Sequence, residues 1–172
     1  SRTNFNAIGG IPPPPPSAPQ FTPPPPPAAA TPTAASLNYG PDLTSSANTI
    51  SGGNVYLGFV PSNAFDNNNS TVANLVSSAS TYIGQNFGTP RNIRRVEVLM
   101  DAPVDHFNAK LQYSDDGVSW FDTNVTANIN SYSSIWHVYD VNDYGAHQYW
   151  RFLDTQTAAY LQVSEITMSE AI

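Results

Sequence analysis

The sequence predicts an all-β protein, in which an antiparallel sandwich of strands follows a proline-rich arm. From residue 37 onward, short stretches of alternating apolar and polar residues are separated by turn-forming residues at close intervals, which is typical of a β-sandwich. Charged residues make up only 11% of the chain, as suits strands joined by many polar turns. After residue 40 no stretch shows a long helical period, which excludes a mixed fold.

The arm, residues 1–36, differs in kind from the body, residues 37–172. Residues 12–16 and residues 23–27 are each five consecutive prolines. Proline fixes φ and lacks an N–H group, so these runs predict an extended polyproline II segment. The arm is either a semi-rigid spacer or an anchor on a protein partner. An anchor would use the large apolar side chains of the arm, which are Phe5, Ile8, Ile11 and Phe21.

Several stretches of the body predict strands. Residues 93–100 are the clearest. The expected faces are Val96, Val98 and Met100 on one side and Arg95, Glu97 and Leu99 on the other. The turn sequence D-D-G at 115–117 follows an alternating stretch and predicts a hairpin. The other expected strands are residues 82–87, 109–114, 118–121, 135–141, 148–153 and 160–168.

An ordered set of short motifs resembles one superfamily. These motifs are A-F-D-N-N-N-S-T at 64–71, Y-I-G-Q-N-F-G at 82–88, Y-S-D-D-G-V-S-W at 113–120, Y-W-R-F at 149–152 and E-I at 165–166. Together they resemble the discoidin, or coagulation-factor type C, superfamily, which includes galactose-binding-like carbohydrate-binding modules. The resemblance implies an eight-stranded antiparallel jelly roll with binding loops at one end.

Two departures from that pattern lie in or just after the first motif. Asn67 stands where the family has glycine, and asparagine tolerates left-handed backbone angles better than other side-chain-bearing residues. Val72 and Ala73 stand where the family has a tryptophan, so other residues must fill that role.

The resemblance implies a structural calcium ion behind the first motif. Its oxygen donors would be Asp66, Asn68 and Thr71, with Glu165 from the last strand. The alternative is a loop of Asx turns whose side chains bind only backbone groups.

A glycan ligand would require exposed aromatic faces and a few polar groups. The candidates in expected loops are Phe59, His106, Phe107, Tyr132 and Tyr160. The alternative for each is an aromatic residue that merely tolerates solvent. Trp120, Trp136 and Trp150 fall at strand or hairpin positions, so we expect them in the core.

Several functional classes are disfavoured. The chain has no cysteine, its three histidines show no metal-ligand spacing, and no nucleophile elbow or phosphate-binding glycine loop occurs, so we expect no enzyme. The net charge of −7 disfavours nucleic acids and anionic membranes as partners. No stretch is apolar for long enough to span a membrane, and the first residues lack the apolar region of a signal peptide.

The expected function is therefore non-catalytic glycan binding by a module displayed in several copies on a larger assembly. A phage or virus decoration, fibre or tail-associated protein fits best, located at the virion surface or outside the cell and attached through its arm. One alternative is a purely structural subunit that caps or cements an assembly by binding protein. The other is a carbohydrate-binding module cut from a secreted glycoside hydrolase.

Overall fold

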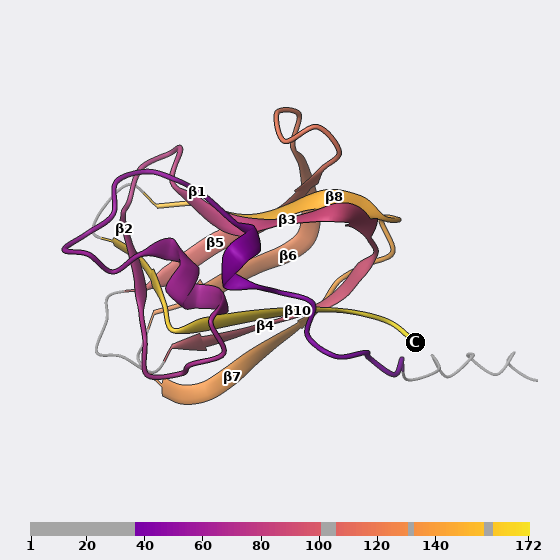
Figure 1. The fold of residues 1–172 in the computed structure, drawn as a ribbon, viewed down its shortest axis with the longest axis horizontal. Helices are drawn as coiled ribbons and strands as arrows, with labels where there is room; N and C mark the ends of the chain where they lie inside the picture. Colours follow the sequence, from indigo (N-terminus) through magenta and orange to yellow (C-terminus); the bar gives the residue numbers. More distant parts are fainter. Residues whose placement is uncertain (1–36, 101–105, 131–132, 157–159) are drawn as a thin grey trace, which may run out of the picture. The chain divides into compact units, whose positions relative to one another are not determined.

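The computed structural model describes residues 37–100, 106–130, 133–156 and 160–172. In these residues the chain forms a β-sandwich of two antiparallel sheets (Figure 1). One sheet has five strands and the other three, which confirms the predicted eight-stranded sandwich. A separate pair of short strands lies at one end. No helix in this part of the chain is long and apolar enough to cross a membrane.

The five-stranded sheet contains the hairpin motif and both strands that flank it. Its strand order is β1 (Thr49–Gly52), β3 (Tyr82–Arg91), β8 (His147–Asp154), β5 (Phe107–Ser114) and β6 (Phe121–Ile129). Neighbouring strands pair antiparallel throughout. Because side chains alternate between the two faces of a strand, this sheet has one face in the core and one facing outward.

The three-stranded sheet covers the other side of the core. Its order is β10 (Glu165–Glu170), β4 (Ile93–Met100) and β7 (Ser133–Asp140). The small pair consists of β2 (Ala73–Val76) and β9 (Tyr160–Val163). The expected strand over residues 160–168 is therefore two strands, one in each of these sheets.

Two short 3-10 helices lie before β2. They span Ser46–Asn48 (η1) and Pro61–Phe65 (η2). Pro61 stands in the first turn of η2, where its missing N–H costs no hydrogen bond. The second helix buries Ala64 and Phe65 and thereby fixes the start of the Asp66 loop.

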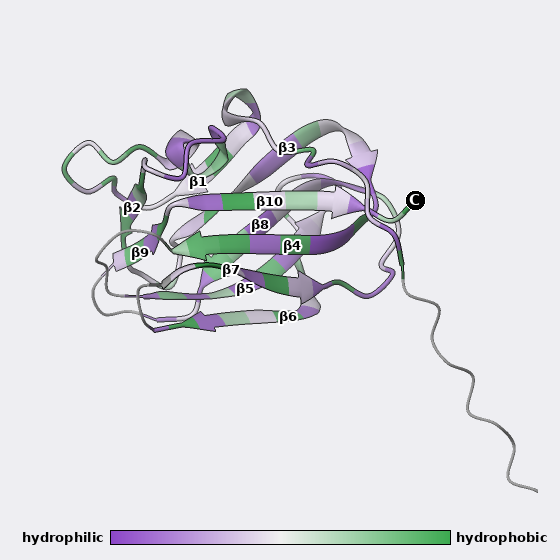
Figure 2. Cartoon of the chain, turned by 90° about the horizontal axis from the view of Figure 1, so that it is seen from below, coloured by the Kyte–Doolittle hydropathy of each residue, from purple (hydrophilic) through white to green (hydrophobic). Residues whose placement is uncertain are grey.

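The core lies between the two large sheets. Val96, Val98 and Met100 are fully buried, which confirms the face predicted for residues 93–100. Figure 2 shows the resulting alternation of apolar and polar residues along β4 and β10. Leu99, expected on the opposite face, is also buried, between Glu165 of β10 and Trp136 of β7.

The three tryptophans do not share one environment. Trp150 is fully buried in the core, as predicted. Trp120 and Trp136 are partly exposed, so the expectation of a core position was wrong for both. Trp136 lies within β7, and Trp120 lies just before β6. Position within a strand cannot reveal this difference, because only strand pairing decides which face is outside.

Candidate functional site

The strands β2 and β9 join four segments at one end of the sandwich. Val55 bridges to Leu75, Leu75 pairs with Leu161, and Leu161 bridges to His106. Four stretches far apart in the sequence therefore lie side by side, at the end away from the C-terminus (Figure 1). We call this region, made of residues 53–81, His106, residues 154–156 and β9, the β2–β9 end.

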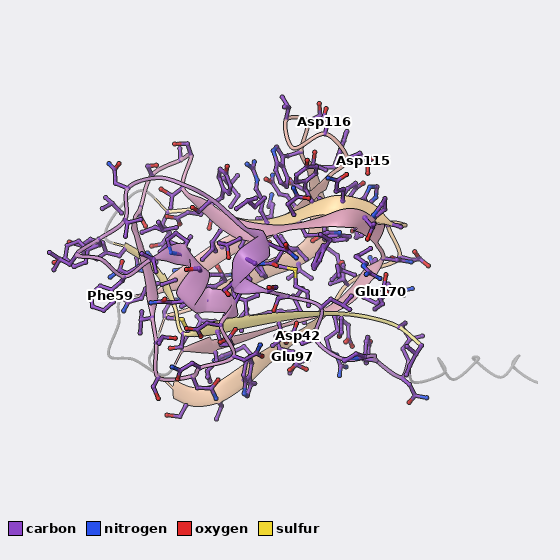
Figure 3. The ribbon with its side chains drawn as sticks, in the orientation of Figure 1. Asp42, Phe59, Glu97, Asp115, Asp116 and Glu170 are labelled. Carbon is purple, nitrogen blue, oxygen red and sulfur yellow. The ribbon has the colours of Figure 1, made fainter. Side chains whose placement is uncertain are left out.

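Exposed apolar side chains project from the segment that contains Val55. Phe59 donates its N–H to the Tyr56 carbonyl, 3.0 Å away, and closes a tight turn. Leu57 and Gly58, the central residues of this turn, have φ values of 46° and 82°. A left-handed backbone is unfavourable for leucine, yet 78% of the Leu57 surface is exposed. Phe59 is 42% exposed beside it, at the edge of the molecule in Figure 3.

An aromatic pair lies next to this turn. The rings of Tyr56 and Tyr160 are 4.4 Å apart between centroids, with an angle of 44° between their planes. Tyr160 pairs with Val76 of β2, and Tyr56 donates its N–H to the carbonyl of Asn74, also in β2. The short strand β2 therefore holds the two tyrosines together from its two sides.

Buried polar atoms at the same end have no hydrogen-bond partner within the described chain. They are Asn74 Oδ1, Ser77 Oγ, His106 Nε2 and Asp154 Oδ2. The other oxygen of Asp154 accepts a hydrogen bond from the Gln156 N–H, 2.9 Å away. A buried polar group without a partner costs free energy, so each of these atoms is a candidate contact for a buried water molecule.

The residues predicted to bind a ligand do not all lie at one site. Phe59, Tyr160 and His106 lie at the β2–β9 end, although His106 is only 8% exposed. The expectation for Phe107 was wrong: it is the first residue of β5 and packs edge-on against Phe152 in the core, with ring centroids 5.1 Å apart. A fully buried ring cannot stack on a sugar. Tyr132 lies outside the described residues.

Two residues of this end were missed. Tyr56 and Leu57 stand before the Asp66 motif in a stretch without strand periodicity. A turn of Leu57 and Gly58 carries no strong signal, because leucine rarely occupies a left-handed position. The pairing of Tyr56 with Tyr160 depends on a contact between distant segments.

The Asp66 loop is a pair of successive Asx turns. Asp66 Oδ1 accepts the Asn68 N–H at 2.9 Å, and Asn68 Oδ1 accepts the Ser70 N–H at 3.1 Å. The Thr71 hydroxyl lies 2.9 Å from Asp66 Oδ2 and 2.8 Å from the Asn68 carbonyl oxygen. Asn67 has a φ of 58°, the left-handed conformation that asparagine was expected to tolerate in place of glycine.

Glu165 reaches this loop from β10. Its Oε2 accepts the Asn68 N–H at 3.2 Å, so this N–H lies between the carboxylates of Asp66 and Glu165. Glu165 Oε1 is buried and has no hydrogen-bond partner in the described part of the chain. Burial, reinforced by the charge of Asp66, raises the pKa of Glu165 to about 7.

Three of the four predicted calcium donors, Asp66, Thr71 and Glu165, therefore meet around the Asn68 backbone, and the Asn68 side-chain oxygen instead accepts the Ser70 N–H. These three side chains supply two carboxylates and a hydroxyl, and the partnerless Glu165 oxygen gives a hard cation an available donor. The residues fit calcium in this respect. Within the described ranges, however, no three His, Asp or Glu side chains form a cluster suited to a metal ion.

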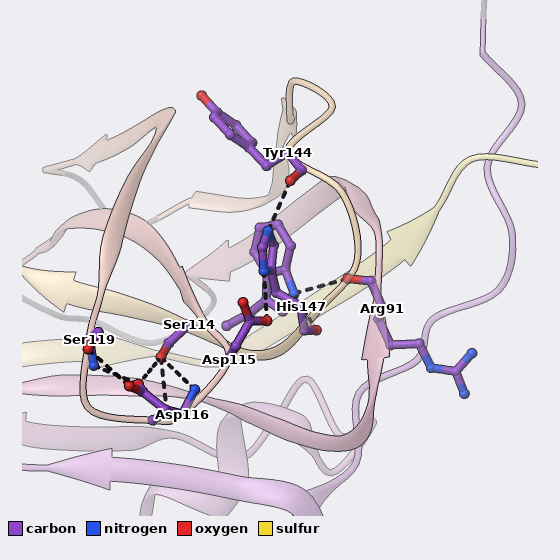
Figure 4. Close-up of polar contacts among 9 residues, drawn as sticks. Arg91, Ser114, Asp115, Asp116, Ser119, Tyr144 and His147 are labelled. Atoms are coloured by element: carbon purple, nitrogen blue, oxygen red, sulfur yellow. Dashed lines mark hydrogen bonds and ion pairs between the residues drawn. The ribbon is translucent and has the colours of Figure 1, made fainter.

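The opposite end carries the β5–β6 hairpin, whose two aspartates have separate structural roles (Figure 4). Asp116 Oδ1 accepts the N–H groups of Val118 and Ser119 at 2.8 and 2.7 Å. These bonds hold the pKa of Asp116 well below its ordinary value. Asp115 instead bonds His147 Nδ1 at 2.9 Å. The arrangement stabilises a turn and does not form a pair of acids facing a substrate.

Comparison with solved structures places the fold. A carbohydrate-binding module named CBM62, from Clostridium thermocellum Xyl5A, has a TM-score of 0.64 at 16% identity, covering 77% of this chain and 99% of its own. A Streptococcus pneumoniae fucose-binding module has a TM-score of 0.60 at 12% identity, covering 74% and 94%. The chain has the discoidin-like fold. This outcome confirms the resemblance carried by the ordered motifs.

A third similar structure joins such a module to an enzyme. Truncated AlyQ with CBM32 and alginate lyase domains has a TM-score of 0.64 at 14% identity, covering 79% of this chain. This chain spans 34% of the length of that two-domain protein. No protein-family model matches the sequence, and no curated protein matches it. At these identities the likeness is one of fold.

Proposed function

We propose that this protein is a non-catalytic glycan-binding module whose site is the β2–β9 end. The observation that carries the proposal is the cluster of apolar and aromatic side chains that reach the surface at this end of the sandwich. Leu57, Phe59 and the Tyr56–Tyr160 pair supply surfaces for sugar C–H groups. The fold is one that other carbohydrate-binding modules use.

The sugar class needs to be tested, because similar modules are named with different sugars. One is named as a fucose-binding module, and the CBM32 of AlyQ was solved with 4,5-unsaturated mannuronic acid. We propose a cell-surface or extracellular glycan as the partner.

A structural calcium ion belongs to the proposal. Asp66, Asn68, Thr71 and Glu165 would hold it, and its charge would neutralise the two neighbouring carboxylates. The ion would stabilise the Asp66 loop and would take no part in chemistry.

The arm supports display on a larger assembly. Its proline runs predict an extended segment, and Phe5, Ile8, Ile11 and Phe21 are its candidate anchors; all four lie outside the described residues. We infer that the protein is a subunit of a phage or virus decoration, fibre or tail, and that it is present in several copies at a virion surface. Many copies would compensate for weak individual sites during cell attachment.

One observation favours a second origin for the module. Similar modules occur beside catalytic domains, as in the AlyQ structure with its alginate lyase domain. The proline-rich arm would then be an interdomain linker of a secreted enzyme.

The deciding experiment is a glycan-array screen with the full chain held in several copies on a biotin–streptavidin support. We expect binding to one sugar class, loss of that binding in Phe59→Ala, and retention in Val118→Ala, which removes an exposed apolar side chain at the opposite end. Failure of the folded protein to bind any glycan would contradict the proposal and favour a structural subunit that binds protein.

A further inference from the structure

The outer face of the five-stranded sheet has an arginine at its centre. Arg151 lies on β8, the middle strand, between the inward-facing residues Trp150 and Phe152. The strand registers place one row of residues straight across this face. In order from β1 to β6, the row is Ile50, Gly84, Arg151, Gln112 and Asp122.

Two aromatic rings contact this arginine, and a third lies beside one of them. Its guanidinium carbon lies 3.8 Å from the centre of the Trp120 ring and 4.6 Å from that of Tyr82. The Trp120 ring lies 6.4 Å from Tyr82 and 6.5 Å, edge-on, from Tyr149. The face therefore combines a half-buried cation with three aromatic surfaces, a combination suited to a ligand with both a charge and apolar C–H groups.

The charge of Arg151 has no counterion in the described part of the protein. Arg91, Arg94 and Arg95 each lie within 4 Å of a carboxylate, and Arg151 does not. Its Nε donates to Gln112 Oε1 at 2.9 Å, and neither terminal nitrogen bonds a described residue. Burial lowers the pKa of Arg151, but a guanidinium remains charged.

The carboxylate in this row does not pair with Arg151. Asp122 is already shared between Lys110 Nζ at 2.9 Å and Gln112 Nε2 at 2.8 Å. Arg151 therefore presents an uncompensated positive charge on a chain with a net charge of −7. A single anionic group with apolar surroundings complements this face.

The fold fixes the surroundings of this arginine. A Cβ atom at Gly84 would overlap the Trp150 carbonyl oxygen and the backbone of Arg151, so only glycine fits beside the arginine. The β5–β6 hairpin rises beyond the layer of β3 and β8 in Figure 1, and Asp116 fixes the turn that ends at Trp120. Trp120 is therefore held over the sheet by its own hairpin.

We propose that this outer face is a second ligand site, separate from the β2–β9 end, and that it binds a uronate unit within an acidic polysaccharide. The two terminal nitrogens of Arg151 match the two oxygens of a planar carboxylate, since Nε is already used by Gln112. Tyr82 and Tyr149 contact the C–H faces of the adjoining sugar rings. A long chain that reached both sites would gain affinity from their linkage.

Calorimetric titration of the full-length protein with tetragalacturonate tests the proposal. The buffer contains no calcium, because the oligouronate would bind it. Arg151→Gln is expected to lower the affinity about ten- to a hundredfold, the usual effect of removing one charge-assisted hydrogen-bonded pair. Arg95→Gln is the matched control, because Arg95 stacks on Tyr39 and carries the same charge on the opposite sheet. Arg95→Gln should bind tetragalacturonate with the affinity of the wild-type protein.

A second readout does not require a variant of the site. In ¹⁵N-labelled wild-type protein, tetragalacturonate should shift the indole N–H signal of Trp120 and leave that of the buried Trp150 unchanged. Phe59→Ala, at the β2–β9 end, should retain this response, which separates this proposal from the site proposed above. A neutral or sulfated tetrasaccharide should bind more weakly than tetragalacturonate.

Three results would overturn the proposal. They are absence of uronate binding, equal losses in Arg151→Gln and Arg95→Gln, and equal or tighter binding of the neutral or sulfated tetrasaccharide. If Arg151→Gln is destabilised, its loss of affinity no longer tests the site. In that case an unchanged Trp120 indole signal in the wild-type titration would by itself overturn the proposal.

Discussion

Leu57 occupies a backbone conformation that its side chain disfavours, at an exposed turn where packing gives no compensation. Strain of this kind persists where the surrounding structure imposes it, and it is often found at functional sites. The exposed leucine is therefore better explained by binding than by folding.

Replacing Leu57 tests this explanation. Leu57→Asn should raise the free energy of unfolding by about 0.5–1 kcal/mol, because asparagine tolerates the left-handed conformation. It should also weaken glycan binding at the β2–β9 end. Urea denaturation and the array measure the two effects. Val118→Asn is the control, since Val118 is 81% exposed and does not have a left-handed φ, and it should give no gain in stability. A loss of stability in Leu57→Asn would contradict the interpretation.

Glu165 predicts an unusual pH dependence in chelator. Its pKa of about 7 in the folded state exceeds the ordinary value of 4.5, so the folded protein binds more protons than the unfolded chain between these pH values. Unfolding free energy should therefore fall by about 3 kcal/mol as pH rises through this window, and then level off.

Denaturation curves between pH 4 and 8 measure this slope. Glu165→Gln should abolish it, because the amide does not titrate. Glu170→Gln, at the far end of the same strand, should leave it in place. A wild-type slope equal to that of Glu165→Gln would show that the raised pKa is not realised in solution.

At the scale of elements, the β5–β6 hairpin shows how a local turn positions a distant contact. Asp116 accepts two backbone N–H groups and thereby sets the course of the chain as far as Trp120. Trp120 then lies against Arg151 of β8, so a turn motif determines the composition of a sheet face.

Removing the Asp116 carboxylate should loosen this hairpin. We expect Asp116→Ala to speed amide hydrogen exchange at Val118 and Ser119 and to lower the melting temperature. Asp116→Asn keeps one acceptor oxygen and should retain most of the protection. Equal exchange in Asp116→Ala and the wild-type protein would mean that strand pairing alone holds the turn.

At the scale of the whole molecule, the Asp66 loop links an early motif to the last strand, so a bound ion there would stabilise the entire sandwich. Calcium at a hundred times its Kd should add about 2.7 kcal/mol to the unfolding free energy. Thermal melts in calcium, magnesium and chelator measure the effect. The rise should require calcium and should be lost in Glu165→Gln; identical melts in calcium and chelator would exclude the ion.

Much of the body could be predicted from local pattern. The strand over residues 93–100 has the bounds that its alternation predicted, and its buried face is the predicted one. The turn at Asp115–Gly117 and the left-handed Asn67 were also identified, because short-range sterics and side-chain-to-backbone hydrogen bonds decide both. For the same reason, the ordered motifs were enough to place the fold.

Three features of the body depended on contacts between distant segments. The sequence alone placed Phe107 in a loop, and only the pairing of β5 with β6 and β8 shows that this ring is in the core. In the same way, the meeting of Tyr56 with Tyr160 and of Trp120 with Arg151 depends on strand register. A strand's own alternation defines two faces, but the sheet pairing and the layer that covers it determine which face meets solvent.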